Sequence, residues 1–510
     1  MSNLDIADEI LRNGNSDSPA ILFGDDVVSY GDLRRHVERL SGSLRSWGCG
    51  AGSRIGLLSD NSPFFVIAYL SIIKAGMCAV PLQENVSQAN FNDIVSTTEM
   101  PLVLASVKYA KKIHEWAIEI GADLFSDREV ELEDGGKVFS IDDMDSARKP
   151  SRTAHRVAQP AEELAAIMFT SGSTGEPKGV MVSHRNIECN TMDIISYIGI
   201  NSSDRAMVVL PFYYCYGASL LHTHLLAGGS LVLNNNFMFP GGVLDEIEAK
   251  ACTGFAGVPS TYQILLRRTS FKERRFPSLR WFQQAGGNLP VPFIREMREA
   301  HPDIRLFVMY GQTEATARLS FLAPEDLDEK IGSIGRGLPS TNLAVLRKDG
   351  RPVRPGSEEV GEIVASGDNI TLGYLNDEEE TALYFKNGCL YTGDIGRVDS
   401  DGFIYLLDRE RDFIKCMGHR VGAKEIEEII AEIPQVVEVA VIGVPHDLYG
   451  EAVKAYIVPL DSKRLTDEDI KKHCLKTLPN YKVPQIVSFV RSIPKNEAGK
   501  VEKAKLKEMG

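Results

Sequence analysis

Hydrophobic positions in the first third of the chain switch between helical and strand-like spacing. Between residues 30 and 44 apolar side chains recur near the 3.6-residue period, which predicts a helix. Two short apolar runs, 55–58 and 78–82, predict buried strands, and a helical pattern over 64–74 lies between them. Strand, helix and strand within about 30 residues predict a βαβ unit and therefore a parallel sheet.

Further along the chain, short apolar runs predict additional strands at 164–169, 206–210, 230–233, 255–258 and 306–309. The polar stretch 126–160 is predicted to be a surface connection. From about residue 340 the hydrophobic pattern indicates short strands at 343–346, 361–364 and 402–406, separated by Gly and Asp. This pattern predicts a small β-rich subdomain.

A charged stretch at 409–412 separates this β-rich part from a helical pattern at 424–433 and a strand at 436–442. A short charged segment between two hydrophobic patterns is a plausible domain boundary, so we expect one domain over 1–408 and a second over 409–510. The predicted class is α/β: a large N-terminal domain of α/β sheets with a β-rich subdomain, and a small α+β C-terminal domain.

Composition narrows the possible functions. The 510 residues are 43% hydrophobic and 25% charged, which excludes disorder, a collagen-like repeat and a disulfide-stapled miniprotein. The longest apolar run, 64–73, is about half of the roughly 20 residues that a membrane span needs. The net charge of −14 disfavours bulk attraction to nucleic acid. The charge is uneven, because residues 409–510 hold 18 Lys and Arg against 16 Asp and Glu.

The eight cysteines are scattered and form no CxxC pair, so neither a zinc site nor a redox motif is indicated. We expect them to be small buried hydrophobes. The N-terminus lacks a basic segment followed by an apolar one, which predicts a cytoplasmic protein with reduced thiols. His222 and His224 belong to no ligand motif; their spacing of two fits opposite sides of an extended segment, and a structural role is expected.

The most informative segment is a loop rich in Gly, Ser and Thr, 170–179, that follows the strand predicted at 164–169. Glycines let the backbone approach phosphate oxygens closely, hydroxyls add hydrogen-bond donors, and Lys178 supplies a positive charge. Pro177 stands where a Walker A loop would need its second Gly, and the loop is not GxGxxG either.

This loop closely resembles the phosphate-binding loop of the adenylate-forming superfamily, which includes acyl-CoA synthetases, nonribosomal peptide adenylation domains and firefly-type luciferases. Further motifs of that superfamily follow in order, from about residue 25 to the end of the chain: Val182–Asn186, Gly257–Tyr262, Gln284–Leu289, Tyr310–Glu314, Gly361–Tyr374, Tyr391–Asp394, Asp408–Lys415 and Pro494–Lys500. The chain is therefore identified as resembling an AMP-dependent acyl-CoA synthetase.

The resemblance implies two steps: a carboxylate attacks the α-phosphorus of ATP to give an acyl-adenylate and pyrophosphate, and a thiol then displaces AMP. Thr170, Glu314 and Lys500 would be the catalytic groups, with Thr170 and Glu314 also on Mg²⁺. Residues implied to bind ATP or CoA are Thr170, Ser171, Gly172, Ser173, Thr174, Gly175, Lys178, Gly286, Gly287, Tyr310, Gly311, Gln312, Thr313, Asp394, Arg409, Lys415, Gly418 and Lys500. The implied acid pocket comprises Tyr214, Gly257, Val258, Gln283, Gly286, Tyr310 and Gly311.

Within this pattern, Lys178 would hold the β- and γ-phosphates, Thr313 would hydrogen-bond the α-phosphate, and Asp394 would accept both ribose hydroxyls. Lys500 would bridge the α-phosphate and the attacking carboxylate as a point charge. For the second step the C-terminal domain would rotate about Arg411, and Gly418 would let the pantetheine thiol approach.

Two departures from the family pattern bear on the substrate. Tyr214 stands where family members often carry a histidine. The segment 212–219 holds no acidic residue, whereas amino-acid-activating members usually have an aspartate there to pair with the substrate ammonium, and a buried ammonium without a partner is costly. An α-amino acid is therefore the less favoured substrate. A fatty acid, an aryl acid or a functionalised acid all remain open.

The acceptor also stays open, because free CoA and an acyl carrier protein present the same phosphopantetheine. A non-catalytic nucleotide-binding relative and a light-emitting oxygenase are the further alternatives. The intact set of Thr174, Lys178, Glu314, Asp394, Arg409 and Lys500 argues against the non-catalytic one. No nucleic-acid partner and no membrane span are expected, and the oligomeric state is left undetermined.

Overall fold

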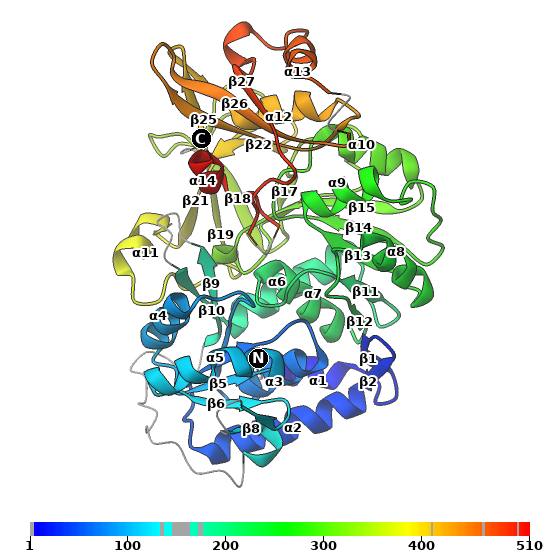
Figure 1. The fold of residues 1–510 in the computed structure, drawn as a ribbon, viewed down its shortest axis with the longest axis vertical. Helices are drawn as coiled ribbons and strands as arrows, with labels where there is room; N and C mark the ends of the chain where they lie inside the picture. The colour runs from blue at the N-terminus through cyan, green and yellow to red at the C-terminus, as the bar shows by residue number, and fades with distance from the viewer. Residues whose placement is uncertain are drawn as a thin grey trace. The chain divides into compact units, whose positions relative to one another are not determined.

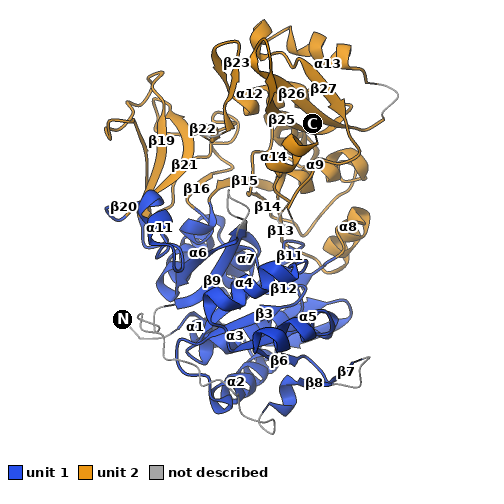
Figure 2. Cartoon of the chain, turned by 60° about the vertical axis from the view of Figure 1, so that its left-hand side comes forward, with its two compact units in different colours: residues 1–235, 312–318, 367–388 blue, residues 236–311, 319–366, 389–510 orange. Residues whose placement is uncertain are grey.

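The computed structural model describes residues 5–132, 137–144, 164–171, 177–409, 412–461, 465–496 and 499–509, with the side chain of Ser171 excepted. The chain divides into two compact units, coloured blue and orange in Figure 2. Unit 1 comprises 1–235, 312–318 and 367–388, and unit 2 comprises 236–311, 319–366 and 389–510. The boundary expected between residues 408 and 409 stays a prediction.

Unit 1 contains a mostly parallel sheet in the strand order β10-β9-β4-β3-β5-β6-β8-β7. Its strands are β3 (Arg54–Leu58), β4 (Cys78–Pro81), β5 (Leu102–Ala105), β6 (Asp123–Ser126), β7 (Val130–Glu131), β8 (Lys137–Ser140), β9 (Leu164–Ser171) and β10 (Pro177–Ser183). The predicted βαβ unit is confirmed, because β3 and β4 pair in parallel and α3 (Pro63–Lys74) connects them.

Four more strands of unit 1 run in the order β11-β12-β1-β2: β1 (Pro19–Phe23), β2 (Asp26–Ser29), β11 (Arg205–Val208) and β12 (Ser230–Leu233). The helices are α1 (Ile6–Asn13), α2 (Tyr30–Trp47), α4 (Gln88–Thr98), α5 (Val107–Ile120), α6 (His184–Ile198), α7 (Cys215–Leu226) and α11 (Glu378–Tyr384). The helix predicted over 30–44 is confirmed as α2, which begins with a capping box from Ser29 and ends at a left-handed Gly48.

Two expectations for unit 1 are wrong. His222 and His224 lie in the buried helix α7, not in an extended segment, so they project about 200° apart around a helix. The apolar residues on all sides of this helix hid its period. The stretch 126–160 is not only a surface connection, because β8 continues the sheet beside β6; residues 145–160 lie outside the described part.

In unit 2, strands β13 (Gly254–Gly257), β14 (Trp281–Gln284) and β15 (Arg305–Tyr310) are parallel neighbours, and β16 (Ser320–Leu322) and β17 (Arg336–Gly337) continue the order beyond β15. Helices α8 (Pro240–Ala249), α9 (Pro259–Arg268) and α10 (Val291–Ala300) lie beside these strands in Figure 1. The predicted β-rich part is confirmed as β18 (Thr341–Leu346), β19 (Gly361–Gly367), β21 (Cys389–Val398) and β22 (Ile404–Arg409).

The last part of unit 2 is a sheet in the order β24-β23-β26-β25, with β27 beside β26. Its elements are β23 (Ile414–Cys416), β24 (His419–Val421), α12 (Ala423–Ala431), β25 (Val436–His446), β26 (Gly450–Pro459), α13 (Asp467–Cys474), β27 (Ile486–Phe489) and α14 (Lys503–Glu508). Two apolar clusters, one on each face of β25, join it to α12 and to α14. The predicted mixed α/β class with a small C-terminal part is confirmed.

Six of the eight cysteines are buried and none of the eight forms a disulfide, in keeping with the expected role as small hydrophobic residues. Within the described ranges, no helix combines the length and the apolar character that crossing a bilayer requires.

Candidate active site

In unit 2 the predicted pocket residues follow the carboxyl ends of three neighbouring strands. Strand β13 ends at Gly257, β14 at Gln284 and β15 at Tyr310. Carboxyl ends of parallel strands meet at one edge of a sheet, which is where open α/β sheets bind ligands. The structure thus brings together the unit 2 residues expected to line the acid and the adenine: Gly257, Val258, Gln283, Gly286, Gly287, Tyr310 and Gly311.

Val258 is a packing point at this edge. A Cβ on Gly286, whose φ is +89°, would lie 3.1 Å from Val258 Cγ1. A Cβ on Gly499, whose φ is +75°, would lie only 2.6 Å from Val258 Cγ2. Both close approaches require glycine. They place the loop that carries Lys500 directly against the predicted acid pocket.

Asp394 is the centre of a buried polar group at the same edge. Its Oδ2 accepts a 2.6 Å hydrogen bond from Tyr310 Oη, and its Oδ1 accepts one of 3.2 Å from Arg409 Nε. Asp394 is 4% exposed, and burial together with the Asp394 charge raises the pKa of Tyr310 well above its usual value. A carboxylate offers about four acceptor positions, so Asp394 can still accept ribose hydroxyls.

The Lys500 loop is a small hairpin held by local contacts. A bridge pairs Lys495 with Val501, and Lys495 Nζ lies 2.6 Å from a carboxylate oxygen of Glu438 on β25. Asn496 Oδ1 accepts the backbone N–H of Lys500 at 2.9 Å. The conformation of Lys500 is therefore tied to β25 and to the rest of the C-terminal sheet.

In unit 1, Thr170 and Lys178 face each other across the antiparallel strands β9 and β10. The strand predicted at 164–169 is confirmed as β9, and β9 and β10 hold the two ends of the glycine-rich segment. Gly172, Ser173, Thr174 and Gly175 lie outside the described residues, as do the side chain of Ser171 and the proposed hinge residue Arg411.

A second polar cluster in unit 1 surrounds Glu314. Its Oε1 accepts a 2.8 Å hydrogen bond from Tyr374 Oη, and its backbone oxygen accepts the amide of Thr371 at 3.0 Å. Lys178 Nζ lies 5.8 Å from the centre of the Tyr374 ring and forms an ion pair with Glu380. The structure thus brings Lys178 and Glu314 together around one tyrosine.

Tyr374 and Glu380 were missed as site residues by sequence reasoning. Tyr374 closes the family motif 361–374, to which no site residue was assigned, and its backbone pairs with β10 at Val180. Glu380 stands in the charged run 378–380 at the start of α11, and such runs are usually solvated. Only the fold shows that this one faces Lys178.

Thr313 and Tyr214 are linked through the start of α7. Thr313 Oγ1 donates to Cys215 Sγ at 3.4 Å, and Tyr214 is the residue that precedes the helix. A Cβ on Gly217 would lie 2.1 Å from the backbone oxygen of Pro211, so the turn before α7 requires glycine here. This close approach constrains the backbone of the turn that carries Tyr214.

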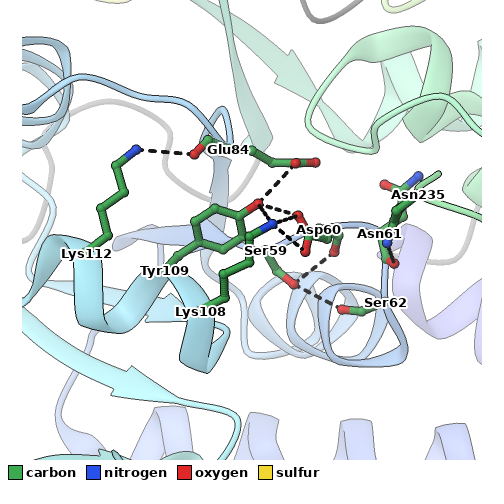
Figure 3. A network of polar contacts seen from close by, with 9 residues as sticks. All are labelled: Ser59, Asp60, Asn61, Ser62, Glu84, Lys108, Tyr109, Lys112 and Asn235. Atoms are coloured by element: carbon green, nitrogen blue, oxygen red, sulfur yellow. Dashed lines mark hydrogen bonds and ion pairs between the residues drawn. The ribbon is translucent and has the colours of Figure 1, made fainter. Parts of the chain in front are cut away.

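A loop after β3, residues 59–62, holds this same turn. Asn61 is 3% exposed; its Nδ2 donates to Leu210 O and its Oδ1 accepts from Phe212 N, both at 2.8 Å. The neighbouring Asp60 is bound by Lys108 and Tyr109, as Figure 3 shows. This network anchors the aromatic segment to the carboxyl end of β3.

Two predicted residues lie elsewhere in unit 2. Lys415 and Gly418 belong to the exposed β23–β24 hairpin, which is separate from the Lys500 hairpin. Gly418 has a φ of +78°, and a Cβ there would meet no atom within 4 Å. Of the predicted ligands in unit 2, these two are the ones placed apart from the β13–β15 edge.

His222 and His224 are structural, as expected. His222 Nε2 lies 3.0 Å from the hydroxyl of buried Tyr69. Burial lowers the pKa of His222 to about 3 and that of His224 to about 4, which keeps both rings neutral at pH 7.

Known proteins share this architecture along the whole chain. A family model described as AMP-binding enzyme matches residues 10–375, and one described as AMP-binding enzyme C-terminal domain matches residues 425–500. The chain belongs to the AMP-binding enzyme family. The resemblance to the adenylate-forming superfamily is thereby confirmed.

Among curated relatives, a feruloyl-CoA synthase from Amycolatopsis is 30% identical over 490 residues, which cover 96% of this chain and 95% of that protein. A 2-succinylbenzoate–CoA ligase from Bacillus licheniformis is 30% identical over 497 residues, covering 96% of each. The o-succinylbenzoate CoA synthetase of Bacillus subtilis, solved with ATP and magnesium, superposes with a TM-score of 0.82 at 27% identity and covers 99% of both chains.

The chain is therefore an enzyme, an AMP-forming acyl-CoA ligase. Its reaction is the two-step one that the motifs predicted, adenylation of a carboxylic acid followed by transfer of the acyl group to CoA. ATP and CoA are its cosubstrates.

Proposed function

We propose that Lys178, Glu314, Asp394, Arg409 and Lys500 are the polar groups that carry this reaction, and that the acid lacks an α-ammonium group. The observation that supports the proposal most is the position of the Lys500 hairpin against Val258, in the same unit and at the same sheet edge as Asp394. Adenylation brings two anions together, and a cation held beside the acid pocket lowers the cost of that approach.

Asp394 would orient the ribose. Tyr310 and Arg409 hold its two oxygens in place, so the carboxylate is already aligned before ATP arrives. Preorganised groups of this kind lose little entropy when the ligand binds. Arg409 is the more exposed partner, with 43% of its side chain accessible, so it can also reach a phosphate.

Lys178 would take the β- and γ-phosphates by exchanging its carboxylate partner Glu380 for a phosphate oxygen. Glu314 fits Mg²⁺ because its carboxylate is a hard oxygen ligand oriented by Tyr374, and Thr170 would be the second protein ligand. Bound Mg²⁺ supplies charge neutralisation for the departing pyrophosphate.

The acid is proposed from the residues assigned to the pocket. Gly257 and Gly286 let the backbone pack closely against Thr261 and Val258, and Tyr214 and Tyr310 offer apolar rings with polar tips. The segment 212–219 contains no acidic side chain to pair with an ammonium group. This combination suits a fatty, aryl or functionalised carboxylic acid. Fatty acid metabolism, a cytoplasmic location and loading of an acyl carrier protein are further proposals, and the assays below test the acid class and the acceptor.

The test is AMP and pyrophosphate release by the purified enzyme with Mg²⁺-ATP and a panel of fatty, aryl, dicarboxylic and α-amino acids. Each acid is tried with CoA and with a holo acyl carrier protein. We expect turnover with at least one acid without an amino group, and thioester formation with CoA. Turnover confined to α-amino acids would contradict the substrate assignment.

Lys500→Ala tests the catalytic assignment, with Lys505→Ala as its control because Lys505 is 61% exposed and pairs only locally with Glu502 among the described contacts. Lys500→Ala should abolish pyrophosphate exchange into ATP and spare thioester formation from supplied acyl-adenylate. Equal loss of both half-reactions would refute the assigned role.

A further inference from the structure

Glu428, on α12, caps the N-terminus of α10. The N-cap residue of α10 itself provides no side-chain hydrogen bond. Glu428 Oε2 accepts the backbone N–H of Val291 at 2.7 Å, and Glu428 Oε1 accepts Asn288 Nδ2 at 2.8 Å. Val291 is the first residue of α10, which follows Pro290 and has no side-chain hydrogen bond from its own N-cap. A negative group at this end is favoured by the unpaired N–H groups and by the helix dipole.

This contact joins segments 137 residues apart along the chain. Asn288 belongs to the segment 284–289, whose glycines were assigned to the adenine, and Glu428 belongs to the C-terminal sheet and its helices. Both groups are half-buried, so the two hydrogen bonds are less screened than surface contacts. Glu428 therefore fixes the C-terminal part of unit 2 onto the predicted nucleotide segment.

A continuous series of packed residues connects Glu428 to the Lys500 hairpin. Ile426 and Ile430 on α12 pack in one apolar cluster with Val441 of β25. The other face of β25 packs against Ile493, immediately before the Lys500 hairpin. On the same strand, Glu438 holds Lys495 within that hairpin. A close-packed path of this kind moves as one body.

Ala423 N–H donates to Asp408 Oδ2 and Lys424 Nζ donates to Leu406 O, both at 2.9 Å, and these bonds tie α12 to β22 rather than to α10. Among the described contacts, two others join the C-terminal part to the region of β13–β15, but they are less specific. Arg267 Nε donates to the backbone oxygen of Val436 at 3.3 Å, and its guanidinium is mainly engaged by Glu296. The Gly499–Val258 contact is apolar and supplies no directional bond. Glu428 is the group among these that supplies two short, charge-assisted hydrogen bonds.

We propose that Glu428 is a positioning residue for adenylation: by capping α10 and binding Asn288, it holds the C-terminal part in the arrangement that presents Lys500 at the acid pocket. The proposal rests on the proposed role of Lys500. It extends that role to a residue outside the segments assigned to ATP, CoA and the acid. Breaking the cap releases the C-terminal part from the arrangement that adenylation needs, and a different arrangement used for thioester formation does not depend on it.

The test measures the two half-reactions separately in the full-length enzyme: pyrophosphate exchange into ATP, and thioester formation from supplied acyl-adenylate and CoA. Glu428→Ala should lower the kcat of exchange by about 10- to 100-fold, since a displacement of about 1 Å at a reacting group costs roughly that factor. The KM for ATP should stay within about twofold, and thioester formation should equal or exceed that of the wild type.

Three further variants keep the proposal falsifiable. Glu428→Gln retains an acceptor for the Val291 amide and should recover part of the exchange rate. Val291→Pro removes the N–H at the first helical position, where proline fits, and should act like Glu428→Ala without adding to it in the double variant. Glu425→Gln is the matched control, because Glu425 lies on the same helix and pairs with Lys482 within the C-terminal part.

Equal losses in both half-reactions, or no loss in either, would overturn the proposal. So would full additivity of Glu428→Ala and Val291→Pro. These results are distinct from failure of the proposed function, in which the wild-type enzyme itself would show no exchange with any acid, or Lys500→Ala would leave exchange intact.

Discussion

Gly499→Ala is the most direct probe of the contact between the Lys500 hairpin and Val258 of the proposed acid pocket. Gly499 has a φ of +75°, and its added Cβ would lie 2.6 Å from Val258 Cγ2. The left-handed conformation costs alanine about 1–2 kcal/mol. The side-chain overlap adds a second cost, because the hairpin must retreat by roughly 0.8 Å to reach ordinary van der Waals contact.

The first cost acts on stability and the second on the position of Lys500. A displacement close to 1 Å at a catalytic group can lower a rate by about 100-fold, so we expect exchange of pyrophosphate into ATP to fall between about 10- and 100-fold. Thioester formation from supplied acyl-adenylate should change by less than about threefold. Both half-reactions are measured on one preparation, together with the thermal midpoint.

Gly350→Ala is the matched control, because Gly350 has a φ of +78° and a Cβ there would meet no atom within 4 Å. It imposes the same backbone strain without the overlap and should leave exchange unchanged. Combining Gly499→Ala with Val258→Ala removes the clashing methyl group and should restore part of the exchange rate relative to Val258→Ala alone. If Gly499→Ala and Gly350→Ala affected exchange equally, the hairpin would not owe its position to Val258.

Three other outcomes follow from buried polar contacts. Tyr310→Phe removes a charge-assisted hydrogen bond from Asp394, so we expect ATP binding to weaken by about 1.5–3 kcal/mol. The KM for ATP should then rise roughly 10-fold or more. An unchanged KM would mean that Asp394 does not need this partner. Asn61→Ala leaves backbone groups of the 210–212 turn without their amide partner. It should raise the KM for the acid more than the KM for ATP. A larger rise in the KM for ATP would count against a link between this turn and the acid pocket. Burial depresses the pKa of His222 to about 3, whereas the unfolded chain binds a proton at this ring below about pH 6.5. The stabilising effect of the neutral ring is therefore complete above pH 6.5 and is lost as the pH falls toward 3. At pH 5 the free energy of unfolding should be lower by about 2 kcal/mol. Urea unfolding of the wild type and of His222→Gln at pH 7 and pH 5 measures this, and an identical pH dependence in both would refute it.

The order and type of most elements could be predicted from the sequence because their apolar patterns are local. The strands at 55–58 and 78–82 and the helix between them were found within one or two residues of their bounds. Helix α7 was not predicted, because apolar residues on every side of it hide the 3.6-residue period of a helix. The extension of the sheet by β8 was missed for a related reason, as a strand of only four residues carries little pattern.

The candidate site likewise contains residues that could be predicted from the sequence and residues that could not. Lys178, Glu314, Asp394 and Lys500 could be named from the sequence because each stands in a distinctive string of residues. The contacts of Tyr374, Glu380 and Glu428 could not be predicted, because each residue bonds to a distant segment: Tyr374 stands in a motif that names no partner for it, and the two glutamates look like solvated carboxylates. Nothing local distinguishes a glutamate that caps a helix 137 residues away from one that faces water.

The sequence by itself determined the family and the reaction and predicted the groups that carry it, because catalytic chemistry demands particular residue types in short, fixed strings. The tertiary structure alone decided what holds those groups: which tyrosine orients Glu314, which carboxylate occupies Lys178, and which packing contact presents Lys500. These are long-range choices made by the pairing of strands and the close packing of side chains, and no short window of sequence contains them.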